Sequence, residues 1–228
     1  MRRLDQLLAS LGYGSRKEIK MMIKNGWVEV KGEIAHDPSM KVEPSWVTIE
    51  EEPLDPTSLI IVMNKPQGVV CSHKDSGKLI YSLLPERFAL RNPPLSTVGR
   101  LDRDTTGVII LTDDGHLNHE LTSPKKEIVK VYDVTLARPL RGDEEKIVAS
   151  GELLLEGDEK PCLPAKLHII DATHVQLELT EGRYHQVKRM FAAMGNHVEA
   201  LHRSRFGTIN SDDLEIGSYK LLTREEME

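Results

Sequence analysis

Cysteine, aromatic residues and long apolar runs are scarce in this chain of 228 residues, and each scarcity excludes a class of protein. The only two cysteines, Cys71 and Cys162, lie far apart and outside any C-x-x-C pair, which argues against a disulfide scaffold or a cysteine-based zinc site. No stretch approaches the length of a membrane span, and the N-terminus lacks the apolar core of a signal peptide. We therefore expect a cytoplasmic protein that does not associate with membranes.

Positive charge is also in short supply, but it is unevenly distributed. The whole chain carries a net charge of −6, with 39% hydrophobic and 29% charged residues, a composition typical of a soluble globular protein. Residues 1–48 have a net charge of +2, which leaves −8 for residues 49–228. Binding to nucleic-acid phosphates requires clustered Lys and Arg. We therefore expect local basic patches rather than bulk attraction to nucleic acid.

The first 48 residues predict a small module of two short helices and a β-hairpin. Leucines recur with helical spacing over residues 4–11. Ser15 and Glu18 have the spacing of a capping box that begins a second helix, which Asn25-Gly26 ends. Alternating residues and a Lys-Gly turn predict a hairpin over residues 27–34.

One side of the second predicted helix is basic, because its cationic residues recur every four positions. A solvated charged face is the alternative for an isolated helix. However, the run RLDQLLASLGYGSRKEIKMMIKNGWVEVKGE resembles the RNA-binding module named after ribosomal protein S-four. The resemblance implies that the module docks on structured RNA backbone, which positions a protein without specifying its chemistry. The expected RNA contacts are Arg2, Arg3, Arg16, Lys17, Lys20 and Lys24.

A linker and a larger domain follow the module. Residues 49–58 combine an acidic run with two prolines and show no periodicity, which is typical of an exposed linker. We therefore expect three parts, namely a module over 1–48, a linker over 49–58 and a domain over 59–228. In the domain, strand patterns outnumber helical ones without regular alternation, which predicts an α+β fold with a mainly antiparallel mixed sheet and flanking helices. We expect strands at 59–63, 69–70, 108–111, 128–136 and 175–179, and helices at 115–122 and 185–194.

The segment GRLDRDTTGVIILTDDG, residues 99–115, places Asp102 and Asp104 in a turn directly before a β-branched run. A carboxylate held there can serve as a nucleophile. The alternative is a turn aspartate that hydrogen-bonds its own backbone. The spacing from Asp102 to Asp113 also approaches that of an EF-hand calcium loop. The flanking residues argue against calcium, because an EF-hand needs a helix on each side and residues 108–111 predict a strand.

A second group of polar residues lies in EGRYHQVKRMFAAMGNHVEALHRSRFG, residues 181–207. An apolar helical stripe places Lys188 at its border and Arg189 on nearly the opposite side, so Lys188 can reach inward. Residues 183–205 contain five Lys or Arg and one acidic residue, although a solvated helix is the alternative explanation. The spacing of the histidines matches no familiar metal motif; they are His185, His197 and His202.

Tyr132 lies in the predicted strand Lys130-Val131-Tyr132-Asp133-Val134, where alternation puts it on the same face as Lys130 and Val134. A half-buried strand tyrosine is the ordinary explanation. In a cleft, the same ring could stack on a nucleobase.

Taken together, GRLDRDTTG, the Lys-x-Tyr strand and EGRYHQVKRM resemble the active-site motifs of pseudouridine synthases. With the leading RNA-binding module, the chain is most similar to the branch that modifies 16S rRNA of the small ribosomal subunit. The resemblance implies that Asp102 is the catalytic carboxylate, that Tyr132 stacks on the target uracil, and that Lys188 pairs with the carboxylate. Many members have Arg at the position of Lys188. An arginine can present two parallel N–H donors to a carboxylate, whereas a lysine offers a single point charge. Arg189 is a less favoured candidate for the residue that pairs with Asp102.

The resemblance further implies that a uridine within RNA is isomerised without a cofactor or a metal. The target uridine must leave the base stack of the RNA. Arg100 is the candidate to hold the displaced RNA backbone or to fill the space that the flipped base leaves. Arg183 and Arg189 are further expected RNA contacts. We expect a monomer whose partner is ribosomal RNA, free or in an assembling subunit. Two alternatives stay open: a synthase for large-subunit rRNA, and a non-catalytic RNA-binding assembly factor. The sequence also leaves open whether Asp102 attacks the ribose, attacks the base or abstracts a proton from a sugar intermediate.

Overall fold

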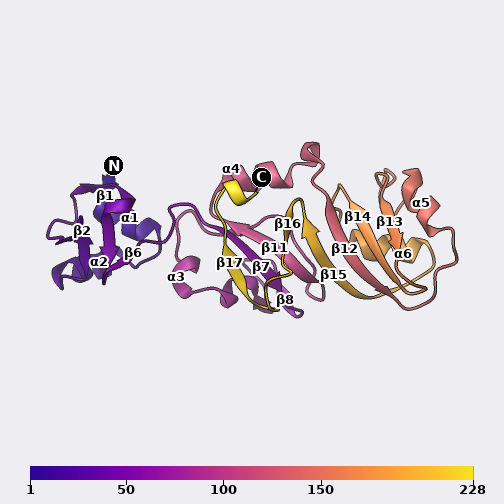
Figure 1. Ribbon diagram of the computed structural model, residues 1–228, viewed down its shortest axis with the longest axis horizontal. Coiled ribbons are helices and arrows are strands. Elements are labelled where there is room, and N and C mark those ends of the chain that lie inside the picture. Colours follow the sequence, from indigo (N-terminus) through magenta and orange to yellow (C-terminus); the bar gives the residue numbers. More distant parts are fainter. Residues whose placement is uncertain (228) are drawn as a thin grey trace.

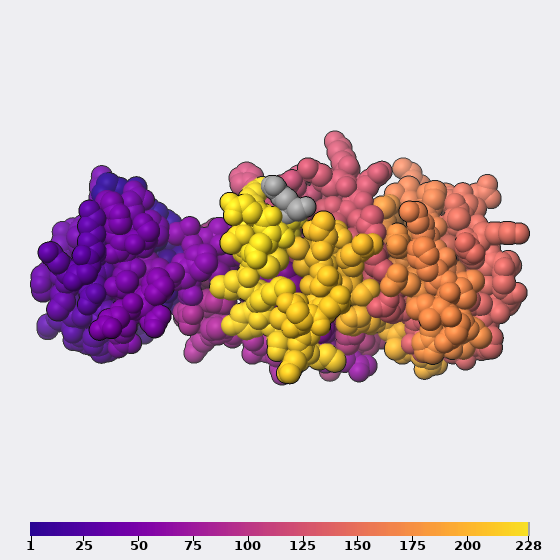
Figure 2. Space-filling model, in the orientation of Figure 1, coloured from indigo at the N-terminus to yellow at the C-terminus, as the bar shows by residue number. Residues whose placement is uncertain are grey.

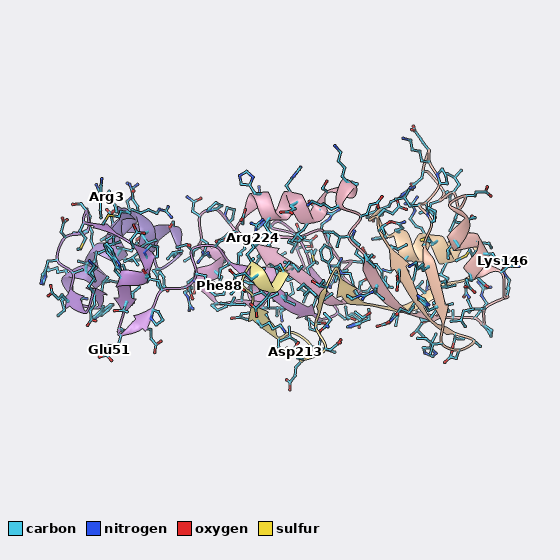
Figure 3. The ribbon with its side chains drawn as sticks, turned by 45° about the horizontal axis from the view of Figure 1, so that its top comes forward. Arg3, Glu51, Phe88, Lys146, Asp213 and Arg224 are labelled. Carbon is cyan, nitrogen blue, oxygen red and sulfur yellow. The ribbon has the colours of Figure 1, made fainter. Side chains whose placement is uncertain are left out.

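The computed structural model describes residues 1–227 and shows an elongated molecule (Figure 1). A small N-terminal module lies at one end, and a long twisted sheet with flanking helices forms the remainder. Figure 2 shows the C-terminal segment, in yellow, on the surface between the module and the far end. In Figure 3, Arg3 and Lys146 mark the two ends, and Phe88 lies beside the junction with the module.

The N-terminal module contains the two helices and the hairpin that the sequence predicts. Helix α1 spans Leu4–Ser10 and α2 spans Arg16–Lys24. The predicted capping box is confirmed, because the Glu18 N–H donates to the Ser15 hydroxyl at 3.3 Å and the Ser15 N–H donates to the Glu18 carboxylate at 2.7 Å. The helices share one apolar core with a four-stranded antiparallel sheet. In spatial order its strands are β3 (Glu33–Ile34), β2 (Val28–Val30), β5 (Val47–Ile49) and β6 (Glu52–Pro53), while β1 (Arg2–Arg3) pairs with β4 (Lys41–Val42).

The predicted linker is partly wrong, because its first half belongs to the module. Strand β6 pairs with β5 in the register Thr48 to Pro53. Glu50 and Glu51 form the hairpin turn between these strands, both with positive φ, 50° and 70°. Two positive φ values suit the right-handed twist of a tight hairpin. An acidic hairpin turn has the same composition as an exposed linker, so the sequence pattern could not separate the two.

The larger part is built on a nine-stranded mixed sheet, which confirms the α+β class. All neighbouring strands are antiparallel except the parallel pair β11–β15. The main path runs β13 (Lys166–Ile169), β14 (His174–Leu179), β12 (Lys130–Leu136), β15 (Val198–Phe206), β11 (Thr106–Thr112), β7 (Ile60–Lys65) and β17 (Tyr219–Leu221), with β10 (Ser96–Thr97) and β16 (Ile209–Asn210) attached at the sides.

Four helices flank this sheet. Helices α5 (Glu144–Ser150) and α6 (Gln186–Ala193) pack on the β12–β14 half, where they share one core cluster with it. Leu117 of α4 (Gly115–Thr122) packs against the β7–β11 half on one face, and Phe88 of α3 (Glu86–Ala89) packs on the opposite face. The short strands β8 (Val69–Val70) and β9 (Lys78–Leu79) lie on the side of α3. The predicted helices 115–122 and 185–194 are thereby confirmed.

The two halves of the sheet meet where β11 runs parallel to β15. Gly107 of β11 has φ +105°, and a Cβ atom there would lie 2.2 Å from the Arg203 carbonyl oxygen of β15. Only glycine permits this approach. The loop that leads into β11 contains Asp102, so the contact fixes where that loop enters the junction.

Candidate active site

A cleft of about 920 Å³ opens at the junction between the two halves of the sheet. Its walls come from several segments that are distant in sequence, among them the 99–105 loop, β12, residues 179–187 and β15. Asp102 and the half-buried Tyr132 both line it. The tyrosine ring packs against the core clusters of both halves. The three sequence motifs therefore converge on one concavity of the size typical of ligand sites.

Lys188 bridges two carboxylates beside this cleft. Its Nζ donates to Asp102 Oδ2 at 3.0 Å and to Asp104 Oδ1 at 2.6 Å. Helix α6 projects Lys188 toward the 99–105 loop, as its place at the border of the apolar stripe predicts. The Asp102 side chain is 25% exposed, whereas that of Asp104 is 60% exposed. Asp102 is thus the carboxylate that a substrate would meet inside the cleft.

The charges in this group stabilise one another. Burial lowers the pKa of Lys188, but the hydrogen bonds to Asp104 and Asp102 together with the negative charges of these two carboxylates raise that pKa above its ordinary value of 10.5. The same hydrogen bond from Lys188 lowers the pKa of Asp104 below its ordinary value. Lys188 is therefore a fixed positive charge at neutral pH.

Lys65, which the sequence analysis did not single out, contacts the backbone of the 99–105 loop. It is the last residue of β7 and is fully buried. Its Nζ donates to the backbone carbonyls of Asp102 at 3.0 Å and Thr105 at 2.8 Å, and to the carbonyl of Pro66 at 3.1 Å. Burial lowers the pKa of Lys65. The one available signal in the sequence was a lysine at the end of an apolar strand.

His185 is a second neighbour of Asp102 that sequence reasoning did not place in the site. Its Nε2 lies 3.3 Å from Asp102 Oδ1, on the carboxylate oxygen that Lys188 leaves free. It precedes α6 with a positive φ of 47°, and its ring stacks on that of Tyr184 with 3.8 Å between centroids. Both side chains line the cleft.

Arg183 and Arg189 lie near the cleft, but their guanidinium groups are engaged by a neighbouring segment. Arg183 donates to Asp158 Oδ2 at 3.0 Å and to the Pro161 carbonyl at 2.6 Å. Arg189 donates to Asp158 Oδ1 and to the Glu156 carbonyl, both at 2.6 Å. Their role as RNA contacts stays a prediction, and the geometry gives them a structural role in holding residues 156–161 against α6.

The remaining predicted contacts fall into two separate regions. Arg100 is exposed at the rim of the cleft. The basic residues of the N-terminal module do not line the cleft. Arg3 is paired with Asp5 at 2.9 Å, and the others are exposed, namely Arg2, Arg16, Lys17, Lys20 and Lys24.

Comparison with known proteins assigns the chain and its N-terminal module to families. A family model described as RNA pseudouridylate synthase matches residues 59–193, and an S4 domain model matches residues 2–45. The chain belongs to the RNA pseudouridylate synthase family. As a pseudouridine synthase it is an isomerase, and its N-terminal module is an S4 domain.

Relatives and a solved structure resemble this pseudouridine synthase over nearly its whole length. Ribosomal small subunit pseudouridine synthase A of Haemophilus influenzae is 41% identical, covering 99% of this chain and 98% of the relative. An uncharacterized RNA pseudouridine synthase of Bacillus subtilis, YtzG, is 40% identical over 99% of this chain and 96% of the relative. A crystal structure of a pseudouridylate synthase superposes with a TM-score of 0.70 at 40% identity, covering 100% of this chain and 98% of that one.

Two further observations concern residues 1–227. Within that range, no group of three or more His, Cys, Asp or Glu side chains is placed to hold a metal ion. The helices of the same range are all too short or too polar to cross a membrane.

Proposed function

We propose that this pseudouridine synthase isomerises a specific uridine of 16S rRNA in the small ribosomal subunit. The H. influenzae relative named for that activity matches the chain from end to end, including the S4 domain. We further propose that the enzyme acts as a cytoplasmic monomer, on free ribosomal RNA or on an assembling subunit.

The observation that carries the catalytic proposal is that Asp102 and Tyr132 line one cleft while Lys188, beside that cleft, pairs with Asp102 at 3.0 Å. In the reaction the glycosidic bond breaks, the uracil turns and a carbon–carbon bond to the ribose forms. Asp102 supplies the carboxylate, and the Lys188 ammonium holds it in place through their 3.0 Å hydrogen bond. Tyr132 stacks on the uracil in the cleft.

The target uridine reaches Asp102 only after it leaves its base stack. We propose that it flips into the cleft and that the exposed Arg100 at the rim holds the displaced backbone or fills the gap. The basic side of α2 docks on RNA backbone away from the cleft and sets the register without choosing the base.

The experiment is to map pseudouridines in the ribosomal RNA of cells that lack this protein, by chemical modification and reverse transcription. The proposal predicts that one reverse-transcription stop disappears from the small-subunit RNA and returns when the native gene is restored. A stop lost from the large-subunit RNA instead would show that the enzyme is a synthase for large-subunit rRNA. If every stop in both RNAs persists, the proposed substrate class is wrong, as a non-catalytic assembly factor would predict.

A further inference from the structure

An exposed pair of aromatic rings stands at the rim of the cleft. Tyr184 is 70% exposed, although a tyrosine ring ordinarily buries much of its apolar surface. One face of the ring stacks on His185, with 3.8 Å between centroids and 17° between planes. Because both residues line the cleft, the exposed Tyr184 ring extends the wall of the active site toward solvent.

The backbone around this pair is held firmly in place. His185 has a left-handed φ of 47°, which costs free energy in a residue with a side chain and persists only where the surroundings impose it. Arg189 donates to the Tyr184 carbonyl at 3.2 Å. On the other side, the Arg183 N–H donates to the buried Gln186 side chain at 2.9 Å. The backbone that carries the ring pair is thus held in place before any substrate arrives.

The stacked Tyr184 and His185 rings lead from the candidate catalytic carboxylate toward solvent. The inner end of the stack is the His185 Nε2 atom, 3.3 Å from Asp102 Oδ1, and its outer end is the exposed Tyr184 ring. A uridine that flips toward Asp102 leaves its neighbours in the strand without a stacking partner. An exposed ring beside the catalytic carboxylate offers such a neighbour a π-face, and stacking of this kind tolerates any base.

We infer that the Tyr184–His185 pair is a stacking subsite for a nucleobase of the RNA next to the target uridine. The inference rests on the proposed function, since it assumes that an RNA uridine is flipped into this cleft. It adds a contact outside the Asp102, Tyr132 and Lys188 group. Tyr184 contributes to RNA affinity through its ring, and its hydroxyl is dispensable.

The experiment compares Tyr184→Leu, which removes the ring but keeps apolar bulk, with Tyr184→Phe, which keeps the ring. Stacking on an aromatic side chain predicts that Tyr184→Leu raises the Kd for a 16S rRNA fragment by roughly 5- to 150-fold. The Kd of Tyr184→Phe should stay within about twofold of native. We expect the rise in KM to exceed the fall in kcat. Ile216→Ala is the matched control, because Ile216 is also 70% exposed and does not line the cleft.

A fluorescent purine analogue at each position next to the target uridine gives a local readout. Its fluorescence should be quenched in complexes with the native enzyme and Tyr184→Phe, and not with Tyr184→Leu. A Kd for Tyr184→Leu within twofold of native, with quenching retained, would overturn the inference. If the native enzyme modifies no uridine, the proposed function fails, while the Kd comparison on the same RNA still decides whether Tyr184 binds a base.

Discussion

Lys188 lies between two carboxylates, and only one of them faces the cleft from a half-buried position. A compact ammonium with three donors can serve Asp102 and Asp104 together, whereas a planar guanidinium favours one carboxylate bidentately. Lys188 is therefore matched by a second acidic partner, Asp104. His185 covers the other oxygen of Asp102, so the carboxylate is oriented from two sides.

The pairing of Asp104 with Lys188 predicts a pH-dependent difference in stability. The pKa of Asp104 in the folded protein is below its ordinary value of 3.8. The contribution of the pairing to stability is therefore complete above about pH 3.8, and it is lost as the pH falls through the lower pKa of the folded state. Because Asp104 is exposed, Asp104→Asn should lower the free energy of unfolding by less than about 1 kcal/mol at pH 7. Urea unfolding of both proteins from pH 7 to pH 3 should show the difference shrinking below about pH 4. A difference that grew toward acid would contradict this assignment.

The Lys65 ammonium donates to four backbone carbonyls, those of Pro66, Asp102, Arg103 and Thr105. Its removal should therefore affect both stability and rate. Lys65→Met keeps the apolar stem but removes the ammonium donor from these carbonyls. The Asp102 carbonyl still accepts the Thr105 N–H and the Arg103 carbonyl still accepts the Gly68 N–H. We expect the loss of the buried charged donor to cost about 2–4 kcal/mol of unfolding free energy. Urea denaturation measures this loss. Activity per folded molecule should also fall, because Asp102 loses its backbone support. A stable Lys65→Met with native kcat would show that the loop holds its shape without the lysine.

At the scale of elements, helix α6 carries the site residue Lys188 and is anchored through Asp158. The Asp158 carboxylate accepts hydrogen bonds from the guanidinium groups of Arg183 and Arg189, whose side chains are each about a quarter exposed or less. Asp158→Ala should lower the unfolding free energy, because both guanidinium groups lose their carboxylate partner. The RNA affinity should not rise, because backbone carbonyls still hold both guanidinium groups. Tighter RNA binding with unchanged stability would instead support direct RNA contacts by these arginines.

The sequence predicted the local elements well, because helical spacing, the Ser15 cap and β-branched runs are local signals. It could not predict which strands pair, and the parallel β11–β15 contact that builds the cleft joins segments about 100 residues apart. The Asp102, Tyr132 and Lys188 group was found through motif resemblance. Lys65 was missed because a buried lysine is rare and its partners are backbone atoms, which leave no trace in a sequence.

At the scale of the whole molecule, the S4 domain is docked on the catalytic domain through specific contacts. Arg87 of α3 binds Asp55 bidentately at 2.6 and 3.0 Å, and the Asp55 N–H donates to the Tyr13 hydroxyl at 2.9 Å. A Cβ on Gly12, which has φ +85°, would lie 2.0 Å from the Arg87 carbonyl oxygen. The basic face of α2 and the cleft are therefore held in one geometry, which lets one RNA engage both.

Gly12→Ala should disturb this docking, since the added methyl group meets backbone. We expect the Kd for a long 16S rRNA fragment to rise about tenfold or more, because the two RNA contacts no longer act together. Gly32→Ala is the matched control: Gly32 also has a positive φ, +80°, but faces open space in the module hairpin. Its conformational cost is similar, and its RNA affinity should stay near native. Equal Kd values for the two variants would show that docking does not contribute to binding.

The central claim is that Asp102, and not the neighbouring Asp104, carries the isomerisation. The most direct measurement is tritium release from uridine-labelled 16S rRNA by the native enzyme, Asp102→Asn and Asp104→Asn. Both variants are isosteric, and both remove one carboxylate from Lys188. The account predicts that Asp102→Asn loses at least about a thousandfold in rate while Asp104→Asn stays within about tenfold of native. Undiminished isomerisation by Asp102→Asn would contradict it.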